Sequence, residues 1–281
     1  MSWGPPWGYV ELYTRKYTPL DQIDTSKTYL LIGNKTETMF PVGKQPAGFN
    51  FFWWDNTMIP HLRYPYKSKQ NNKQWGRILY NCWNIPADHQ PNNDDRVRVN
   101  EILKWSSGYN DVAELWNGCK DTKSFNGNML IIRSSDRNYM DYHGKTFDQY
   151  FSEIEPTLKM FGIRYTIREK IHKAKDRINR QITDEIINGH YDCVLANNSA
   201  GAVEAAVLGI PVITTSDLNP ARNISTPWEY FVDNGDVLKY TAEEIDKWIT
   251  ALCGYTFYKD KEIDNLKFLN YHPQGEVYVC L

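Results

Sequence analysis

The chain has 281 residues, of which 41 % are hydrophobic and 23 % charged, and this composition indicates a globular protein with one large domain or two small ones. Its formal net charge of −2 excludes a uniformly basic coat for nucleic acid, although it permits a local basic patch. No apolar run approaches the ~18 residues of a membrane span, and no signal peptide is evident. The five scattered cysteines favour reduced thiols in a cytoplasmic protein and argue against structural zinc.

The first half of the chain predicts a reduced or irregular α/β unit. Thr28–Gly33 reads as a strand and Gly48–Asn56 as a second apolar run, whereas the asparagine pairs at 71–72 and 92–93 indicate loops. The stretch Trp116–Gly127 is the predicted link between domains. We therefore expect an N-terminal domain over residues 1–120 and a C-terminal domain over 121–281, whose tail could pack back on the first.

The second half predicts alternating strands and helices. Strands are expected at Asn128–Ser134, Ile163–Glu169, Tyr191–Ala196 and Pro211–Thr215. Helical patterns lie between them, at Phe147–Phe161, Ile178–Gly189 and Ser199–Gly209, and Pro156 is expected to break or restart the first. Thr241 and Glu244 form a capping box before a last helix, which runs through Leu252. This order predicts a Rossmann-like parallel sheet with right-handed crossovers.

The segment Asn197–Gly201 follows the third of these strands and opens a helix. In open parallel sheets ligands bind beyond the carboxyl ends of the strands. Small residues at such a turn let a ligand approach the backbone, and the N–H groups and dipole of the helix favour an anion such as a diphosphate. Glu204, further along this helix, would accept hydrogen bonds from a diol such as a ribose. On spacing alone, Glu204 is equally well a half-exposed glutamate of a plain βαβ unit.

The stretch EAAVLGIPVI, Glu204–Ile213, resembles the E-A-x-x-x-G-x-P-V-I segment of GT-B glycosyltransferases, which use nucleotide sugars. The resemblance implies an α/β fold with two Rossmann-like domains and parallel sheets, the N-terminal domain being reduced or irregular. It implies that Glu204 binds the ribose of the donor. The donor phosphates would then be bound by Ser199, Ala200 and Gly201, and Asn198 is a further candidate for donor binding.

The strand-end stretch IREK, Ile167–Lys170, is the second point of similarity to that family. The family often places an arginine and a lysine against the donor diphosphate at this position. The resemblance therefore implies that Arg168 and Lys170 bind the diphosphate, Arg168 in a bidentate way. Because other basic residues are close in sequence, both side chains are alternatively solvated charges.

The chain as a whole resembles a group of small phage-encoded proteins that carry NSS or NSA, then AVEA, then GIPV, and that glycosylate hydroxymethylated pyrimidines in phage DNA. Their aromatic segment ending in D-N or D-H is similar to Phe51–Asn56. This resemblance implies a nucleotide-sugar co-substrate, with UDP-sugar as the expected donor and no cofactor. It also implies double-stranded DNA as acceptor and a location in the host cytoplasm. The chain lacks the second glutamate of the paired-glutamate motif found in retaining enzymes.

Sugar transfer to a hydroxyl needs a base, and the sequence offers several candidates. Asp55 follows four aromatic residues, and burial among them would raise its pKa; an Asp-Asn pair is also a common turn. The stretch Arg133–Gly144, read as a loop beside the ligand, supplies further candidates. Within it, Asp136, Asp141 and His143 are possible catalytic groups, and Ser134 and Ser135 are candidate donor contacts.

The interval 56–87 contains no acidic residue and interleaves basic with aromatic side chains, a pattern suited to DNA phosphates and exposed bases but also to a solvated loop. The candidate acceptor contacts are Arg63, Lys67, Lys69, Lys73, Trp75 and Arg77. No metal cluster or D-x-D motif occurs, so no metal is expected. Two alternatives stay open: transfer to a surface glycan or lipid, although no helix suited to membrane docking is evident, and a non-catalytic protein that binds nucleotides or nucleic acid.

Overall fold

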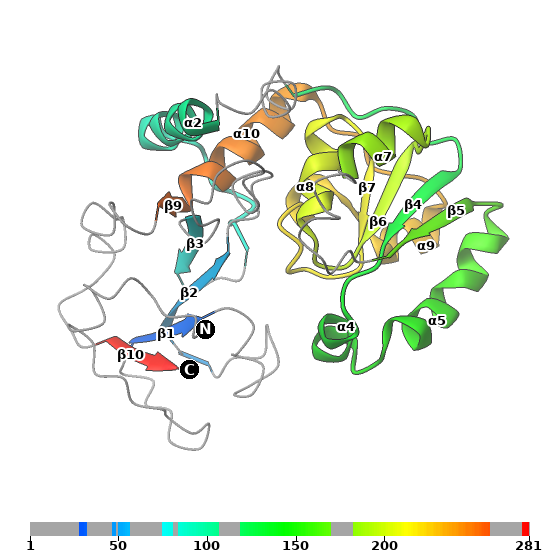
Figure 1. Ribbon diagram of the computed structural model, residues 1–281, viewed down its shortest axis with the longest axis horizontal. Coiled ribbons are helices and arrows are strands. Elements are labelled where there is room, and N and C mark those ends of the chain that lie inside the picture. Colours follow the sequence, from blue (N-terminus) through cyan, green and yellow to red (C-terminus); the bar gives the residue numbers. More distant parts are fainter. Residues whose placement is uncertain are drawn as a thin grey trace.

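The computed structural model describes residues 28–32, 47–48, 50–56, 75–80, 84–106, 119–169, 182–258 and 277–280. These residues form two five-stranded sheets, and helix α10 (Ala242–Gly254) lies between the two sheets (Figure 1). The mixed α/β class expected from the sequence is therefore confirmed. Within these ranges no helix is both long and apolar enough to cross a membrane.

The first sheet has the order β10-β1-β2-β3-β9 and joins the two ends of the described chain. Its strands are β1 (Thr28–Ile32), β2 (Asn50–Asn56), β3 (Trp75–Tyr80), β9 (Thr256–Tyr258) and β10 (Val277–Cys280). Strand β1 is parallel to β10 and β2, whereas β3 is antiparallel to β2 and β9. The sheet is thus mixed rather than parallel throughout. The two strands expected in this half both form.

Helix α2 (Asn93–Ser106) begins where the sequence suggested a loop. Asn92 acts as its N-cap, because its Oδ1 accepts a hydrogen bond from the N–H of Asp95 at 3.0 Å. The Asp95 carboxylate in return accepts from the N–H of Asn92 at 3.0 Å. Asparagine favours helix N-caps as much as turns, so the loop expectation was wrong for the second asparagine pair.

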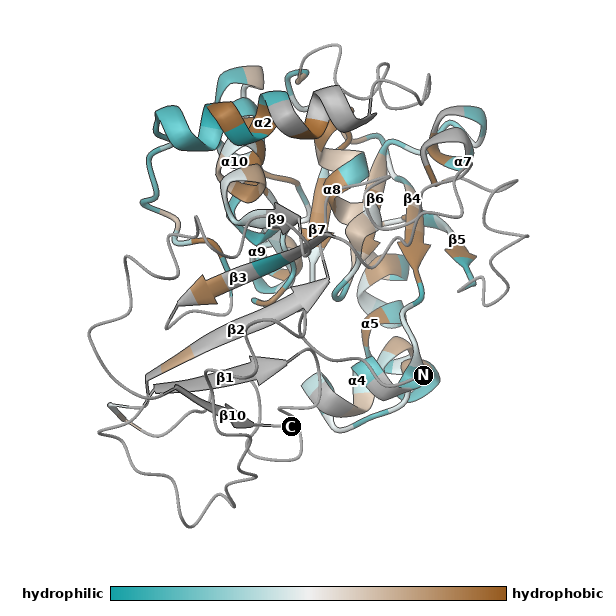
Figure 2. Cartoon of the chain, turned by 60° about the vertical axis from the view of Figure 1, so that its left-hand side comes forward, coloured by the Kyte–Doolittle hydropathy of each residue, from teal (hydrophilic) through white to brown (hydrophobic). Residues whose placement is uncertain are grey.

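The second sheet is parallel throughout, as predicted, with the order β5-β4-β6-β7-β8. Its strands are β4 (Asn128–Ile132), β5 (Arg164–Arg168), β6 (Cys193–Ala196), β7 (Val212–Thr214) and β8 (Thr226–Pro227). Figure 2 shows hydrophobic colours on β4 and β7 and hydrophilic colours on the outer turns of α2. Strands buried on both faces read as continuous apolar runs, which explains why this half was predictable.

Helices cover both faces of the parallel sheet (Figure 1). One face packs on α4 (Asp136–His143), α5 (Phe147–Met160) and α9 (Trp228–Asn234). The other packs on α7 (Ile182–Asn188), α8 (Ala200–Val207), the 3-10 turn η3 (Arg222–Ile224) and α10. This second core continues into the first sheet, because Phe51 of β2 and Leu79 of β3 belong to it.

Two sequence expectations in this half were wrong. Helix α5 runs through Pro156 without a break. Proline removes the hydrogen bond to the carbonyl of Ser152, but both residues are exposed, so water can satisfy that carbonyl while the apolar face stays buried. The stretch after β4 is helix α4 rather than a loop. Ser135 caps this helix, and Tyr139 is buried against Phe147 with ring centroids 5.2 Å apart.

Candidate functional site

The topological switch point of the parallel sheet lies between β4 and β6, because the chain leaves β4 toward β5 and returns past it to β6. In open α/β sheets this is where ligands bind, outside the carboxyl ends of the strands. The segments after the two strands are in contact here. The Oγ of Ser134, a buried side chain, donates to the carbonyl of Asn198 at 3.4 Å. Of the predicted donor residues, the structure therefore brings these two together.

Asn197 is the centre of the hydrogen bonds at this edge and is only 1 % exposed. Its Oδ1 lies 3.2 Å from His143 Nε2 at the end of α4 and accepts from Thr215 Oγ1, beyond β7, at 3.3 Å. Its carbonyl accepts from Asn219 Nδ2 at 2.7 Å. One asparagine thus ties together the segments that follow β4, β6 and β7.

Two amide atoms at this edge have capacity for a further hydrogen bond. Asn197 Nδ2 and Asn198 Oδ1 are buried and have no hydrogen-bond partner among the described residues. The other end of the Asn198 amide donates to Tyr142 Oη at 2.9 Å. A buried polar atom left without a partner costs ~1–3 kcal/mol, so each of these two atoms favours a hydroxyl-bearing ligand or an ordered water.

The aromatic side of the site is uncharged at neutral pH. His143 stacks on Tyr150 with ring centroids 4.2 Å apart. Burial lowers the pKa of His143 despite its hydrogen bond to Asn197, and burial raises the pKa of Tyr150 to about 12. Because the amide oxygen of Asn197 is an acceptor, Nε2 of the neutral imidazole carries the proton, and Nδ1 is the ring nitrogen that can accept another.

The N-terminus of α8 follows directly after Asn198. Ser199 is its N-cap, and its Oγ accepts from the N–H of Gly201 at 3.2 Å. Ala200 and Glu204 are half-buried, Glu204 lying one turn beyond Gly201. The first-turn N–H groups of a helix and its dipole together favour an anion at this end.

Gly201 has a packing role that the sequence did not suggest. A Cβ at this position would lie 2.4 Å from Ile182 Cδ1 and 2.9 Å from Ile132 Cδ1. Glycine therefore lets α8 pack closely against α7 and β4. This contact gives the glycine a packing reason, and the expected approach of a ligand to its backbone stays a prediction.

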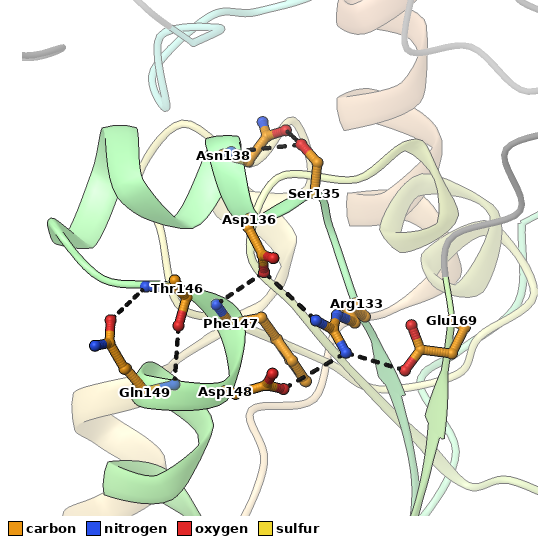
Figure 3. Close-up of polar contacts among 9 residues, drawn as sticks. All are labelled: Arg133, Ser135, Asp136, Asn138, Thr146, Phe147, Asp148, Gln149 and Glu169. Carbon is orange, nitrogen blue, oxygen red and sulfur yellow. Dashed lines mark hydrogen bonds and ion pairs between the residues drawn. The ribbon is translucent and has the colours of Figure 1, made fainter.

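Arg133 gathers three carboxylates at the ends of β4 and β5 (Figure 3). Its guanidinium lies 3.2 Å from Glu169, 3.5 Å from Asp148 and 3.5 Å from Asp136, and it covers the ring of Phe147 at 4.7 Å. Asp136 also accepts a hydrogen bond from the backbone N–H of Phe147 at 3.2 Å. This candidate catalytic group therefore joins α4 to α5, and Ser135 is used as the cap of α4.

Arg168 forms an ion pair with Glu185 of α7, the Nε–Oε2 distance being 2.7 Å. The arginine side chain is 15 % exposed and the glutamate 34 %. Both lie on the α7–α8 face, since Ile182, one turn before Glu185, packs at Gly201. The predicted diphosphate-binding cation thus already has an anionic partner, and Lys170 lies outside the described residues.

The first sheet contains three of the predicted residues. Asp55 of β2 is directly opposite Arg77 of β3 in the antiparallel register, and Trp75 opens β3 opposite Tyr258. Arg77 is 0 % exposed, which corrects the expectation that it belongs to a solvated basic surface. The remaining acceptor candidates, Arg63, Lys67, Lys69 and Lys73, lie outside the described residues.

Sequence reasoning placed Asn197 in the turn at this edge but assigned no role to three residues that the structure brings there: Tyr142, Thr215 and Asn219. The available signal was the asparagine pair directly after a buried strand, followed by a serine cap. Within the part of the chain that the structure describes, no group of three or more His, Cys, Asp or Glu residues is arranged so that it could hold a metal ion.

No known family model matches the chain, and no curated protein matches it. Among solved structures it is similar to Thermosulfurimonas dismutans KpsC, a beta Kdo 2,7 transferase. The sequence identity is 13 %, the TM-score is 0.41, and the likeness covers 85 % of this chain and 81 % of that one. At this identity and TM-score, nothing about activity is carried over from that protein.

Proposed function

We propose that the protein is a glycosyltransferase that binds a nucleotide sugar, with UDP-sugar the first candidate, at the carboxyl edge of the parallel sheet. The observation that carries the proposal is the pair Asn197 and Asn198. Their buried, unsatisfied amide atoms stand at the topological switch point and directly precede the N-terminus of α8. Such a site offers hydrogen bonds for hydroxyls beside a helix end that favours a diphosphate.

The donor fits this edge as follows. The diphosphate binds to the N-terminus of α8 at Ser199 and Ala200, and Glu204 accepts hydrogen bonds from the ribose. Arg168 turns from Glu185 to the diphosphate and stabilises the charge of the leaving group. The sequence stretch Glu204–Ile213 supports this assignment by its resemblance to the corresponding GT-B segment.

In the transfer step an acceptor hydroxyl oxygen forms a bond to the anomeric carbon of the sugar. The bond from that carbon to the diphosphate oxygen breaks, and the hydroxyl proton passes to a base. His143, neutral at pH 7 and at the site, is suited to accept it, and Asp55 is the alternative from the first sheet. Asp136 ranks behind both, because its carboxylate is already bound to Arg133 and to the backbone.

Double-stranded DNA with hydroxymethylated pyrimidines is the proposed acceptor. It is supported by the interval 56–87, which has basic residues and no acidic residue. Arg77 is excluded from the proposed DNA contacts because it is buried. One observation favours a second candidate, a neutral glycan. Asp136, Asp148 and Glu169 surround Arg133 beside the site and are 53 %, 76 % and 67 % exposed. Three exposed carboxylates around a single arginine oppose the approach of a polyanion.

A transfer screen tests the proposal. The protein is incubated with a panel of nucleotide sugars, each with hydroxymethylated duplex DNA, unmodified duplex, an oligosaccharide or no acceptor. Release of nucleotide and the mass of the DNA nucleosides are then measured. Sugar on hydroxymethylated nucleosides supports the DNA proposal, and transfer only to the oligosaccharide supports the second candidate. Binding of nucleotides without turnover under any condition overturns the enzyme and leaves a non-catalytic nucleotide-binding protein.

A further inference from the structure

A hydrogen-bonded contact joins the segment after β3, which begins at Asn84, to the loop that follows β7. Asn84 Nδ2 donates to the carbonyl of Asn219 at 2.6 Å and to the carbonyl of Asp217 at 3.2 Å. Asn84 is separated from Asn219 by 135 residues in the chain, so this contact fixes a long-range arrangement. It connects the segment that follows β3 to the part of the chain that holds the parallel sheet.

Asn219 carries this contact onward to the candidate site. It is 0 % exposed; its Oδ1 accepts from the N–H of Ala221 at 2.9 Å and its Nδ2 donates to the carbonyl of Asn197 at 2.7 Å. Both ends of its amide are therefore occupied, which sets the orientation of the side chain. Asn219 thus accepts a hydrogen bond from Asn84 through its backbone carbonyl and donates one to the backbone of Asn197 through its side chain.

The hydrogen bond to Asn197 orients the start of the site. The carbonyl of Asn197 and the N–H of Asn198 belong to one planar trans peptide, in which the two groups point in opposite directions. Holding the carbonyl toward Asn219 therefore directs the N–H of Asn198 away from it. The orientation of this peptide sets the approach of the chain to Ser199, the N-cap of α8.

We propose that Asn84 and Asn219 are positioning residues, which couple the seating of the Asn84–Ile85 segment to the geometry of the Asn197–Ser199 site. The consequence for donor binding rests on the proposed function, whereas the coupling itself does not. A shift of the Asn84–Ile85 segment relative to the parallel sheet then changes the geometry of the Asn197–Ser199 site. Neither residue touches the ligand in this arrangement; both act through Asn197.

The chain offers a matched control for this proposal. Asn223 Nδ2 donates to the carbonyl of Ile85 at 2.8 Å, so it joins the same two segments as Asn84 does. Asn223 is likewise half-buried. It has no hydrogen bond to Asn197 or Asn219 among the described contacts. Asn84→Ala removes the two long-range hydrogen bonds to Asn219 and Asp217, and Asn223→Ala removes one between the same segments, but only the first variant acts on Asn219.

The test measures amide hydrogen exchange by mass spectrometry in the full-length protein. Peptides covering residues 194–203 are compared among wild type, Asn84→Ala and Asn223→Ala, and UDP binding is measured by calorimetry. Asn84→Ala is expected to raise the exchange rate of these peptides by about 5-fold and to weaken UDP binding by a similar factor. Asn223→Ala is expected to leave both within about 2-fold of wild type, with a comparable change in melting temperature.

Equal exchange in the two variants would overturn the coupling, whether or not UDP binds. If wild type binds no nucleotide but the exchange difference is present, the proposed function fails and the coupling stands. Asn219→Asp provides a second variant, because it keeps the acceptor for Ala221 and loses the donor to Asn197. It is expected to raise exchange in residues 194–203 at least as much as Asn84→Ala, and wild-type exchange in a folded Asn219→Asp protein would also overturn the coupling.

Discussion

Glu185 binds the guanidinium of Arg168 at the end of β5, with 2.7 Å between Oε2 and Nε. The carboxylate therefore competes with any anion that approaches this arginine. Because the pair is partly buried, it is screened less by salt than an exposed pair would be. The candidate diphosphate site thus has a lower positive charge than the sequence indicates.

Glu185→Gln removes this competition while it keeps the shape of the side chain. We expect the affinity for UDP, measured by calorimetry, to rise by about 3- to 10-fold, since Arg168 no longer has to leave a carboxylate. Arg168→Ala is the paired variant and should weaken UDP binding. Unchanged or weaker binding in Glu185→Gln would mean that Arg168 serves the α7–β5 contact alone.

His143 gives the protein a pH-dependent stability. Its pKa in the folded state is lowered by burial from the ordinary value of 6.5. As the pH falls, this histidine is therefore protonated in the unfolded chain before it is protonated in the folded protein. The contribution of His143 to the free energy of unfolding is fully present above pH 6.5 and is lost as the pH falls toward the lowered pKa. Urea unfolding at pH 7.5 and pH 5.5 should show a smaller loss of stability in His143→Gln than in wild type.

The control for this prediction is His190→Gln, which removes an exposed imidazole. Its loss of stability between the two pH values should equal that of wild type. If His143→Gln also behaves like wild type, the His143 imidazole does not lose a proton on folding.

Gly201→Ala tests the packing of α8. The added methyl group would meet Ile182 Cδ1, so we expect a loss of ~1–3 kcal/mol in the free energy of unfolding. Ile182→Val removes that Cδ1 atom and alone should cost ~0.5–1.5 kcal/mol. Because the valine makes room for the alanine, the double variant should lose less than the sum of the single changes. Additive losses in denaturant unfolding would show that Ile182 does not restrict this position.

The parallel sheet was predictable because local sequence and burial agree there. Met129–Ile132 and Cys193–Ala196 are short apolar runs, and the structure buries every one of these residues. The turn after β6 was equally readable, since Ser199 is a cap in sequence and in structure. In both cases the information is contained in fewer than about ten neighbouring residues.

The rest depended on partners distant in sequence. In the sequence Asp136 resembles a free catalytic carboxylate, but in the structure it binds the N–H of Phe147 and the side chain of Arg133. Arg77 lies in a basic interval, but it is part of β3, between β2 and β9, and its side chain is fully buried. Asn219 contacts Asn197, 22 residues away, and Asn84, 135 residues away. Such contacts have no local signal.

The acceptor proposal makes a prediction about the basic interval, whose lysines lie outside the described residues. Replacing Lys67, Lys69 and Lys73 by alanine removes up to three phosphate contacts. The slope of log K against log salt for DNA binding should then fall by up to ~3 units, and UDP affinity should not change. Filter binding at several salt concentrations measures the slope.

The control replaces Lys145, Lys159 and Lys247, which form ion pairs with glutamates on the surface of the C-terminal half. These changes should leave the slope close to that of wild type. A wild-type slope in the Lys67, Lys69 and Lys73 variant would exclude these lysines as the DNA contact and favour the glycan acceptor.

The central claim is that the carboxyl edge of the parallel sheet binds the nucleoside diphosphate part of a sugar donor. Calorimetric titration of UDP, CDP, GDP and ADP into wild type and into Glu204→Gln tests it most directly, with thermal melting to establish that the variant is folded. We predict saturable one-to-one binding of at least one of these nucleotides to wild type, weakened by ~10-fold or more in Glu204→Gln, because the glutamine loses a charged acceptor for the ribose hydroxyls. Absence of binding for all four nucleotides, or equal affinity in the folded variant, would contradict the claim.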